Sequence, residues 1–214
     1  MKHLIIIGAS GFSRDMYYVV TQSIGYLENF DIKGFLVHKK EYLNSLDGYN
    51  DYPPILGTIY DYQIENDDVF IIALGDVPVK CEVGNYMKSK GAKFQTIIHK
   101  DAQIRNNVKI GDGSIIESHA HLGSEVTIGE NCLIQAFACI AHDCSVDDYS
   151  RIDVRCLLTG RSKVGKNVTI HSNAVINQKI IVEDNATVAA LSFVIRNVKA
   201  GTTVMGNPAK RLEY

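Results

Sequence analysis

The 214-residue sequence contains no tryptophan, only four prolines and only five cysteines. No two cysteines form a C-x-x-C pair and their number is odd, which argues against a disulfide-stapled secreted domain. Neither sign of charge is in excess, because 22 basic and 24 acidic side chains leave a net charge of −2. The chain therefore lacks the basic surface of a nucleic-acid-binding protein. No apolar run approaches the roughly 20 residues that span a membrane, and the apolar start at residues 4–7 is too short for the core of a signal peptide. We expect a cytoplasmic protein that binds neither nucleic acid nor membrane.

What the sequence does contain is a six-residue repeat. From Ile104 to Val194 every sixth residue is aliphatic, sixteen times in succession. A period of six is neither helical nor strictly alternating, and it suits a unit of one short strand and one corner. Three units then close a triangular coil of eighteen residues, and such coils stack at the strand spacing of about 4.8 Å. We predict a parallel β-helix from about Ile104 onward, in which residues eighteen apart lie above one another.

A second series of mostly small residues lies two positions before each aliphatic one. Cys132, Cys144 and Cys156 belong to this series, so we interpret them as core residues rather than reactive thiols. The flat parallel faces of such a prism favour side-by-side packing. We therefore expect an oligomer.

The first 96 residues have a different pattern, in which apolar strands alternate with helical segments. This alternation predicts an α/β domain with a small parallel sheet at 1–96, followed by the β-helix domain at 97–214. The strands are expected at 4–7, 32–37 and 69–74, and the helices at 12–23 and 79–91.

The turn Gly8-Ala9-Ser10-Gly11 lies between the first expected strand and helix, where backbone N–H groups can receive a phosphate. The full dinucleotide fingerprint needs glycine where Ser13 stands. The second expected strand ends in Val37-His38-Lys39-Lys40 and offers no acid for a ribose hydroxyl. An NAD-dependent reaction is therefore disfavoured, and both a phosphate site and a tight turn without a ligand remain open.

His142-Asp143 is the strongest candidate for chemistry in the repeat. The pair lies between two inward-facing positions, so His142 should project from a face, and the adjacent carboxylate can hold the imidazole tautomer and raise its basicity. One coil above, Gly160 would let a linear ligand lie close and would expose a backbone N–H to an oxyanion. The alternative is a solvated surface pair. None of the seven histidines has a metal-ligand spacing, so we expect no metal.

The repeat and several motifs are similar to those of the hexapeptide-repeat acyltransferases. The chain most resembles the nucleotide-sugar N-acetyltransferases and sialic-acid O-acetyltransferases of this group, over nearly its whole length. The motifs that carry the resemblance are Gly8-Ala9-Ser10-Gly11, Gly34-Phe35-Leu36, Ala73-Leu74-Gly75-Asp76, Ile97-Ile98-His99-Lys100, Ile140-Ala141-His142-Asp143-Cys144 and the closing segment 204–210.

The resemblance implies a left-handed β-helix, a homotrimer with active sites between subunits, and acetyl-CoA as co-substrate. It implies that His142 is the general base and that Asp143 raises its basicity. The acetyl-CoA contacts that it implies are Arg151, Gly160, Ser172, Ala190, Asn207, Pro208 and Lys210. The nucleotide-sugar contacts that it implies are Ser10, Gly11, Phe12, Val37, His38, Gly75 and Asp76.

Four positions depart from the family pattern. Relatives carry histidine where Phe12 and Arg151 stand, an acidic pair near Val37-His38, and glycine where Ala190 stands. The acetyl-CoA half of the site is therefore better supported than the nucleotide half.

We predict acetyl transfer from acetyl-CoA to the amino group of a nucleotide-linked sugar, with UDP as the nucleotide, in glycan biosynthesis. One alternative is O-acetylation of a sugar, as in the sialic-acid enzymes. Another is a catalytically silent β-helix that binds a sugar nucleotide or has a structural role.

Overall fold

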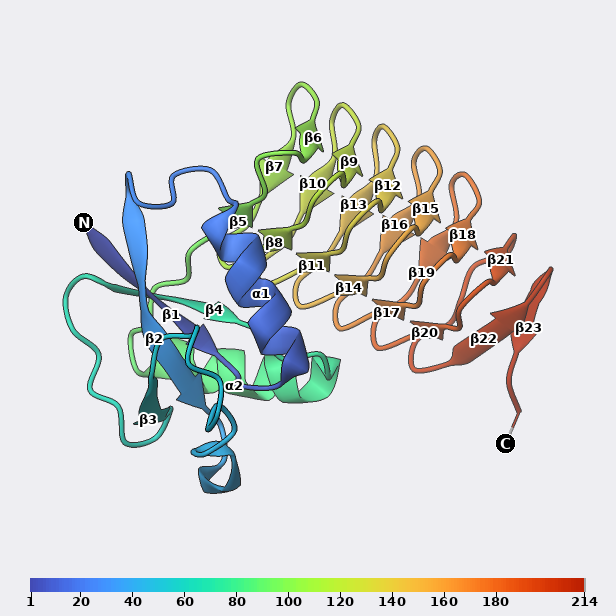
Figure 1. The fold of residues 1–214 in the computed structure, drawn as a ribbon. Coiled ribbons are helices and arrows are strands. Elements are labelled where there is room, and N and C mark those ends of the chain that lie inside the picture. The colour runs from blue at the N-terminus through green and yellow to red at the C-terminus, as the bar shows by residue number, and fades with distance from the viewer. Residues whose placement is uncertain (214) are drawn as a thin grey trace. The chain divides into compact units, whose positions relative to one another are not determined.

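The computed structural model describes residues 1–213, so the last residue of the second predicted domain, 214, lies outside the described part (Figure 1). Contacts within the chain divide it into two units, Met1–Ile97 and a second unit from Ile98 onward. Within residues 1–213 no helix is long and apolar enough to cross a membrane. The predicted fold class is confirmed: a small parallel sheet with helices is followed by a parallel β-helix.

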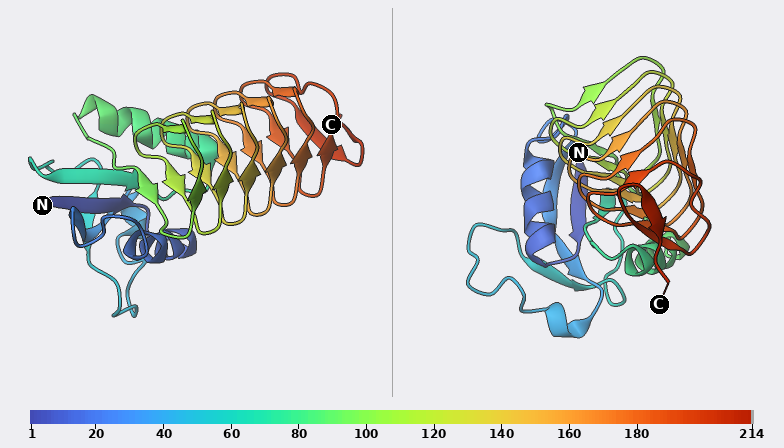
Figure 2. Two further views of the ribbon diagram at one scale, coloured as in Figure 1. Left: turned by 90° about the horizontal axis from the view of Figure 1, so that it is seen from above. Right: turned by 90° about the vertical axis from the view of Figure 1, so that its right-hand side faces the viewer.

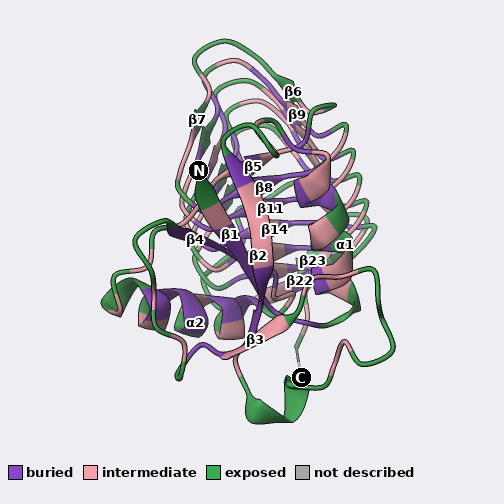
Figure 3. Cartoon of the chain, turned by 60° about the vertical axis from the view of Figure 1, so that its left-hand side comes forward, coloured by how far each residue is buried: buried purple, intermediate pink, exposed green. Residues whose placement is uncertain are grey.

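The first unit is built on a four-stranded parallel sheet with strand order β3-β2-β1-β4. Leu4 to Ile7 of β1 and the whole of β4 are buried (Figure 3), which is why both strands are continuous apolar runs. The predicted strands and helices are all present, but β3 was not predicted, because its four residues include Gly57 and form no apolar run. The elements are β1 Lys2–Ile7, α1 Gly11–Thr21, β2 Phe30–Val37, the 3-10 helix η1 Lys40–Tyr42, β3 Ile55–Thr58, β4 Asp68–Ile72 and α2 Val77–Ser89.

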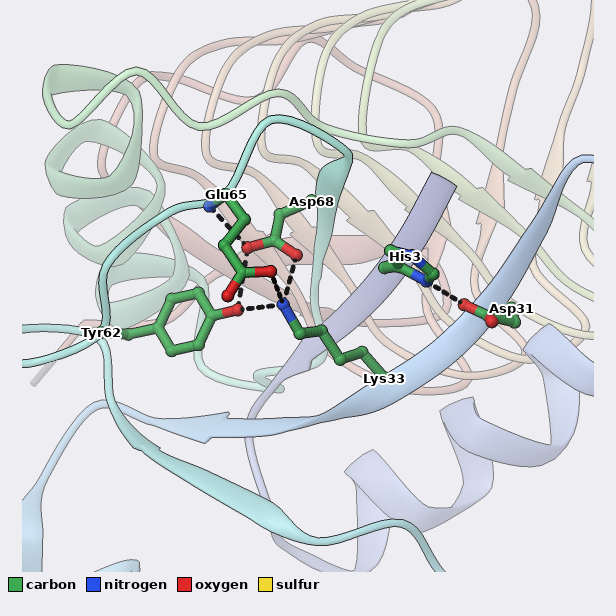
Figure 4. A network of polar contacts seen from close by, with 6 residues as sticks. All are labelled: His3, Asp31, Lys33, Tyr62, Glu65 and Asp68. Carbon is green, nitrogen blue, oxygen red and sulfur yellow. Dashed lines mark hydrogen bonds and ion pairs between the residues drawn. The ribbon is translucent and has the colours of Figure 1, made fainter. Parts of the chain in front are cut away.

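A polar network ties β2 to the start of β4 (Figure 4). Lys33 Nζ donates to the Tyr62 hydroxyl at 2.8 Å, to Glu65 Oε2 at 2.7 Å and to Asp68 Oδ1 at 2.9 Å. The Tyr62 hydroxyl donates to the other oxygen of Asp68 at 2.8 Å. Burial alone would raise the pKa of Asp68, but the hydrogen bonds from Lys33, the Glu65 backbone and Tyr62 outweigh it and lower that pKa. These hydrogen bonds satisfy the carboxylate of Asp68, which is fully buried.

The second unit contains sixteen two-residue strands, β6 to β21, arranged in three parallel sheets that form the faces of a prism (Figures 1 and 2). The first face holds β6 Gln103–Ile104, β9 His121–Leu122, β12 Cys139–Ile140, β15 Leu157–Leu158, β18 Val175–Ile176 and β21 Phe193–Val194. The second face holds β7 Lys109–Ile110, β10 Thr127–Ile128, β13 Ser145–Val146, β16 Lys163–Val164 and β19 Ile181–Val182. The third face holds β5 Ile97–Ile98, β8 Ile115–Ile116, β11 Leu133–Ile134, β14 Arg151–Ile152, β17 Thr169–Ile170, β20 Thr187–Val188, β22 Thr203–Gly206 and β23 Ala209–Arg211.

Each strand pairs with the strand eighteen residues further along, as in Leu133 with Arg151 and Ile134 with Ile152. The predicted coil length is therefore confirmed. The inward aliphatic residues from Ile116 to Val194 are at most 2% exposed, whereas Ile104, which has no coil beneath it, is 38% exposed. Cys132, Cys144 and Cys156 are each 1% exposed, which confirms them as core residues.

The corners of the prism share one backbone conformation. From Asn107 onward the third residue of nearly every corner has a positive φ, including Asp143 at 59°. Its N–H donates to the preceding coil, as from Arg161 to the His142 carbonyl oxygen at 3.1 Å. Asparagine suits this conformation and several corners use it, but Asp143 and Arg161 occupy it with charged side chains. The fold thus fixes where the polar corner residues project.

Candidate active site

His142 and Asp143 lie at one corner of the prism rather than on a flat face as predicted. We name this corner the dyad corner; it joins the first face to the second and comprises residues 105–107, 123–125, 141–143, 159–161 and 177–179. His142 Nδ1 lies 2.8 Å from Asp143 Oδ2. Both side chains are accessible, at 62% and 44% exposure.

The carboxylate of Asp143 is held in its ionised form. The hydrogen bond with His142 is the main cause that lowers the pKa of Asp143, and Arg161, whose Nε lies 3.6 Å from Oδ2, adds to it. An ionised carboxylate beside Nδ1 accepts a hydrogen bond from the Nδ1–H group, and this tautomer has its lone pair on Nε2. The pair therefore presents an accessible imidazole, oriented by a carboxylate, at the corner.

Gly160, one coil further on, lies directly against the ring of His142. A Cβ atom built on Gly160 would lie 2.8 Å from both Cε1 and Nε2 of that ring. The glycine was predicted to leave space for a ligand; the structure shows that the imidazole itself fills this space. Among residues 1–213 no hydrogen bond uses the Gly160 N–H. The imidazole thus lies against a glycine whose backbone donor is available.

Two hollows flank His142 along the dyad corner. The hollow on the carboxyl-terminal side, which we name the Gly160 hollow, measures about 300 Å³, and the one on the amino-terminal side, the Arg105 hollow, about 570 Å³. His142 lines both. The other residues of the Gly160 hollow are Thr159, Gly160, Arg161, Asn177 and Gln178. Those of the Arg105 hollow are Arg105, Asn106, His121, Gly123, Ser124, Cys139 and Ala141.

The remaining residues predicted to contact acetyl-CoA lie elsewhere on the prism. Arg151 is in β14 on the third face, and Ser172 and Ala190 are at the corner between the third face and the first. Within one chain none of the three shares a corner with His142. Asn207 and Pro208 form the turn between β22 and β23, and Lys210 lines a cavity of about 340 Å³ at this end together with Arg196 and Arg211.

Arg151 is part of a second histidine–aspartate group, which was not predicted. Arg151 Nη2 donates to Asp153 Oδ2 at 2.9 Å, and the same oxygen lies 3.1 Å from His171 Nδ1. The carboxylate is only 4% exposed, whereas the side chain of His171 is 42% exposed. Asp153 and His171 are eighteen residues apart, so the coil length already placed them one above the other. Arg151, which the resemblance implied as an acetyl-CoA contact, is thus held by a carboxylate of its own chain.

The predicted nucleotide-sugar residues of the first unit gather at one edge of its sheet. Gly11 follows β1, His38 follows β2 and Gly75 follows β4, and parallel strands place these ends at a common edge. The strand order reverses direction beside β1, which is where ligands bind in open α/β sheets. Ser10, Phe12, Val37 and Asp76 belong to the same edge.

Ser13 explains why the incomplete glycine fingerprint still forms a tight turn. Its hydroxyl is buried, donates to the Ala73 carbonyl oxygen at 2.9 Å and accepts from the Ser10 N–H at 3.2 Å. A Cβ on Gly8 would lie 2.5 Å from this hydroxyl oxygen, so glycine is required there. The serine therefore connects the turn to the end of β4.

Three residues at this edge have structural partners of their own. Val37 is fully buried, so only its backbone is available to a ligand. Asp76 caps α2 by accepting from the Val79 N–H at 2.9 Å. The His38 ring lies 5.2 Å from that of Tyr42, and burial lowers the pKa of His38, which favours the neutral imidazole.

Comparison with known proteins shows the family. A model of the GMPPB C-terminal domain matches residues 92–205, more than half of the chain, and a model of the PglD N-terminal domain matches residues 3–87. The chain belongs to the GMPPB C-terminal domain family. The predicted resemblance to hexapeptide-repeat nucleotide-sugar N-acetyltransferases is thereby confirmed.

Individual relatives agree with that resemblance. GDP-perosamine N-acetyltransferase of Escherichia coli O157:H7 is 27% identical over 149 residues, 67% of each protein. An acyl-[acyl-carrier-protein]–UDP-N-acetylglucosamine O-acyltransferase of Ectopseudomonas mendocina is 28% identical over 58% of this chain and 46% of its own, so the chain spans about half the length of such relatives.

Two solved structures share the fold over essentially the whole chain. The acetyltransferase domain of PglB from Neisseria gonorrhoeae FA1090 superposes with a TM-score of 0.87 at 22% identity, covering 99% of this chain and 100% of that one. A mutant of GDP-perosamine N-acetyl transferase from Caulobacter crescentus, in complex with CoA and GDP-perosamine, superposes with a TM-score of 0.88 at 16% identity, covering 100% and 98%.

Proposed function

We propose that the protein transfers an acetyl group from acetyl-CoA to the amino group of a nucleotide-linked sugar. The observation that carries this proposal is the dyad corner, where a histidine oriented by an ionised carboxylate lies against Gly160, whose N–H makes no hydrogen bond among residues 1–213. The pair supplies a base, and the N–H supplies a donor for a developing negative charge. Acyl transfer needs both groups.

In the first step the sugar amine attacks the thioester carbonyl carbon while His142 Nε2 accepts a proton from the amine. The new C–N bond forms and the carbonyl oxygen becomes an oxyanion that accepts a hydrogen bond from the Gly160 N–H. Collapse of this intermediate breaks the C–S bond, and the proton on His142 passes to the departing sulfur. The products are the N-acetylated sugar nucleotide and the free thiol of CoA, with His142 neutral again.

A second copy of the chain completes the acetyl-CoA site in this proposal. Arg151, Ser172 and Ala190 lie away from the dyad corner within one chain, so they reach His142 only from a neighbouring subunit. The parallel faces of the prism suit such side-by-side packing, and a homotrimer provides three equivalent sites. Sedimentation of the protein as a monomer would contradict this part of the proposal.

The sheet edge of the first unit holds the nucleotide in this proposal. The N–H groups of Gly11 and Phe12 at the start of α1 face the position where a phosphate binds a helix N-terminus. UDP is the predicted nucleotide, while the names of relatives include both GDP and UDP. A thermal-shift comparison of the two nucleotides with CoA present decides between them, because only a bound ligand raises the melting temperature.

Free thiols at all five cysteines suit a cytoplasmic protein, and cell fractionation checks that location.

The test is release of CoA thiol with amino-sugar and hydroxy-sugar acceptors. The His142→Ala variant should lose about 10²- to 10⁴-fold in turnover, the range that general-base catalysis supplies. His3→Ala is the matched control, because this partly exposed histidine also pairs with an aspartate, with its Nδ1 2.8 Å from Asp31 Oδ1, but lies at the start of β1, at the opposite end of the strand from the proposed nucleotide edge. Wild-type turnover in His142→Ala would refute the role of the dyad. Thiol release with hydroxy sugars alone would favour O-acetylation, and none with any acceptor would favour a silent binding protein.

A further inference from the structure

The two hollows beside His142 differ in chemistry as well as in size. The Gly160 hollow contains the backbone donor and the amide side chains of Asn177 and Gln178. Its one cation, Arg161, already lies 3.6 Å from the Asp143 carboxylate. The Arg105 hollow is about 270 Å³ larger, 570 less 300, and it extends over the two coils that precede His142.

The cation of the Arg105 hollow has no ion-pair partner among residues 1–213. The side chain of Arg105 is exposed, and the acid nearest in the corner series, Glu125, accepts a hydrogen bond from Asn107 at 2.6 Å. An unpaired guanidinium beside a hollow is suited to an anionic ligand, because it offers a fork of N–H donors to phosphate oxygens.

The rest of the lining suits a hydroxylated ring. His121 Nδ1 lies 3.3 Å from Gln103 Oε1, which leaves Nε2 for another partner. Ser124 and Asn106 add a hydroxyl and an amide. Gly123 lets the next coil stack closely, since a Cβ there would lie 2.7 Å from the backbone nitrogen of His142. These groups donate and accept hydrogen bonds on several sides of one space.

We propose that the Arg105 hollow is the acceptor subsite, which holds the sugar ring of the nucleotide sugar while Arg105 pairs with the phosphate attached to that ring. This inference rests on the proposed function and specifies the side from which each substrate approaches His142. The amine approaches His142 from the side of the earlier coils, and the thioester lies on the side of Gly160. The residues that select the sugar are then Arg105, His121 and Ser124.

The first experiment separates the two substrates kinetically. Arg105→Gln should raise the KM for the nucleotide sugar about tenfold or more, the usual effect of losing a charge-assisted hydrogen bond, with the KM for acetyl-CoA unchanged. Lys109→Gln is the matched control, because Lys109 is an exposed cation of the same coil that lies on the second face. An increase in the KM for acetyl-CoA instead would overturn the assignment by placing the hollow on the donor side.

The second experiment does not depend on catalysis. Binding of GDP-perosamine and of UDP-glucosamine is measured by calorimetry for the wild type, Arg105→Gln and Ser124→Leu, whose larger side chain fills the hollow. Both variants should bind the preferred sugar nucleotide at least about tenfold more weakly and keep the thermal shift caused by CoA. Equal affinities in all three proteins would overturn the subsite. The wild type could release no thiol while the two variants still bind the sugar nucleotide more weakly than it does. That result would support the subsite and refute only the proposed catalysis.

Discussion

Gly160→Ala tests the geometry of the dyad with a single methyl group. The added Cβ would lie 2.8 Å from Cε1 and Nε2 of His142, closer than real Cβ atoms approach. The neighbour that must move is the imidazole, since the alanine is joined to the backbone of the coil. Displacing Nε2 by about 1 Å is expected to lower kcat roughly 10²-fold. Gly160 does not have a positive φ, so alanine fits its backbone and the fold should keep its stability.

The assay is initial-rate thiol release, with thermal unfolding as the check on folding. His142→Ala and the double variant complete a mutant cycle with Gly160→Ala. If the glycine acts by making room for the ring, adding Gly160→Ala to His142→Ala should cost nothing further. Two results would refute the reasoning: a kcat for Gly160→Ala within about threefold of wild type, or a loss in the double variant equal to the product of the single losses.

Two further predictions concern stability rather than catalysis. Asp68→Asn should destabilise the protein by about 3 kcal/mol, because it leaves Lys33, which is 25% exposed, without its buried carboxylate partner. Urea unfolding measures this change in the free energy of unfolding. A change below about 1 kcal/mol would show that Glu65 alone suffices as the partner of Lys33. His99 is buried and its Nδ1 accepts from the Asp101 N–H at 3.1 Å. Burial, only partly opposed by Asp101, lowers its pKa from 6.5, so its contribution to stability is present above pH 6.5 and is lost as the pH falls through the lowered value. His99→Asn, which keeps an acceptor but does not titrate, should lose less stability than wild type between pH 7.5 and 5; parallel curves for the two proteins would contradict this.

The β-helix could be predicted almost completely, because the sequence of each six-residue unit indicates which residue faces inward and where the corner lies. The local signal at Ile140 does not depend on distant parts of the chain, and sixteen repetitions make it unambiguous. β3 was missed for the opposite reason. Ile55 and Leu56 stand before Gly57 without an apolar run, and their strand forms only because β2 offers an edge for pairing.

The site was predictable in part. The eighteen-residue spacing placed Gly160 beside His142. The same spacing separates Asp153 from His171, so their pairing was also predictable. What the spacing does not contain is side-chain direction. Arg151 contacts both carboxylate oxygens of Asp153, and the His142 imidazole occupies the space beside Gly160. Both arrangements depend on side-chain rotamers, which the repeat pattern does not determine.

The closed coil also determines which changes in chain length this protein can accept. Removing one six-residue unit between His142 and Gly160 would preserve the repeat in the sequence, yet every later residue would advance by one face of the prism. Gly160 would then lie at a different corner from the imidazole, although each motif remained intact. Only insertions and deletions of a whole coil keep all later columns aligned, and those placed beyond the dyad leave its immediate neighbours untouched. Evolution can therefore lengthen the prism in steps of eighteen residues, whereas a step of six or twelve residues separates the site residues although the repeat that specifies the fold stays intact.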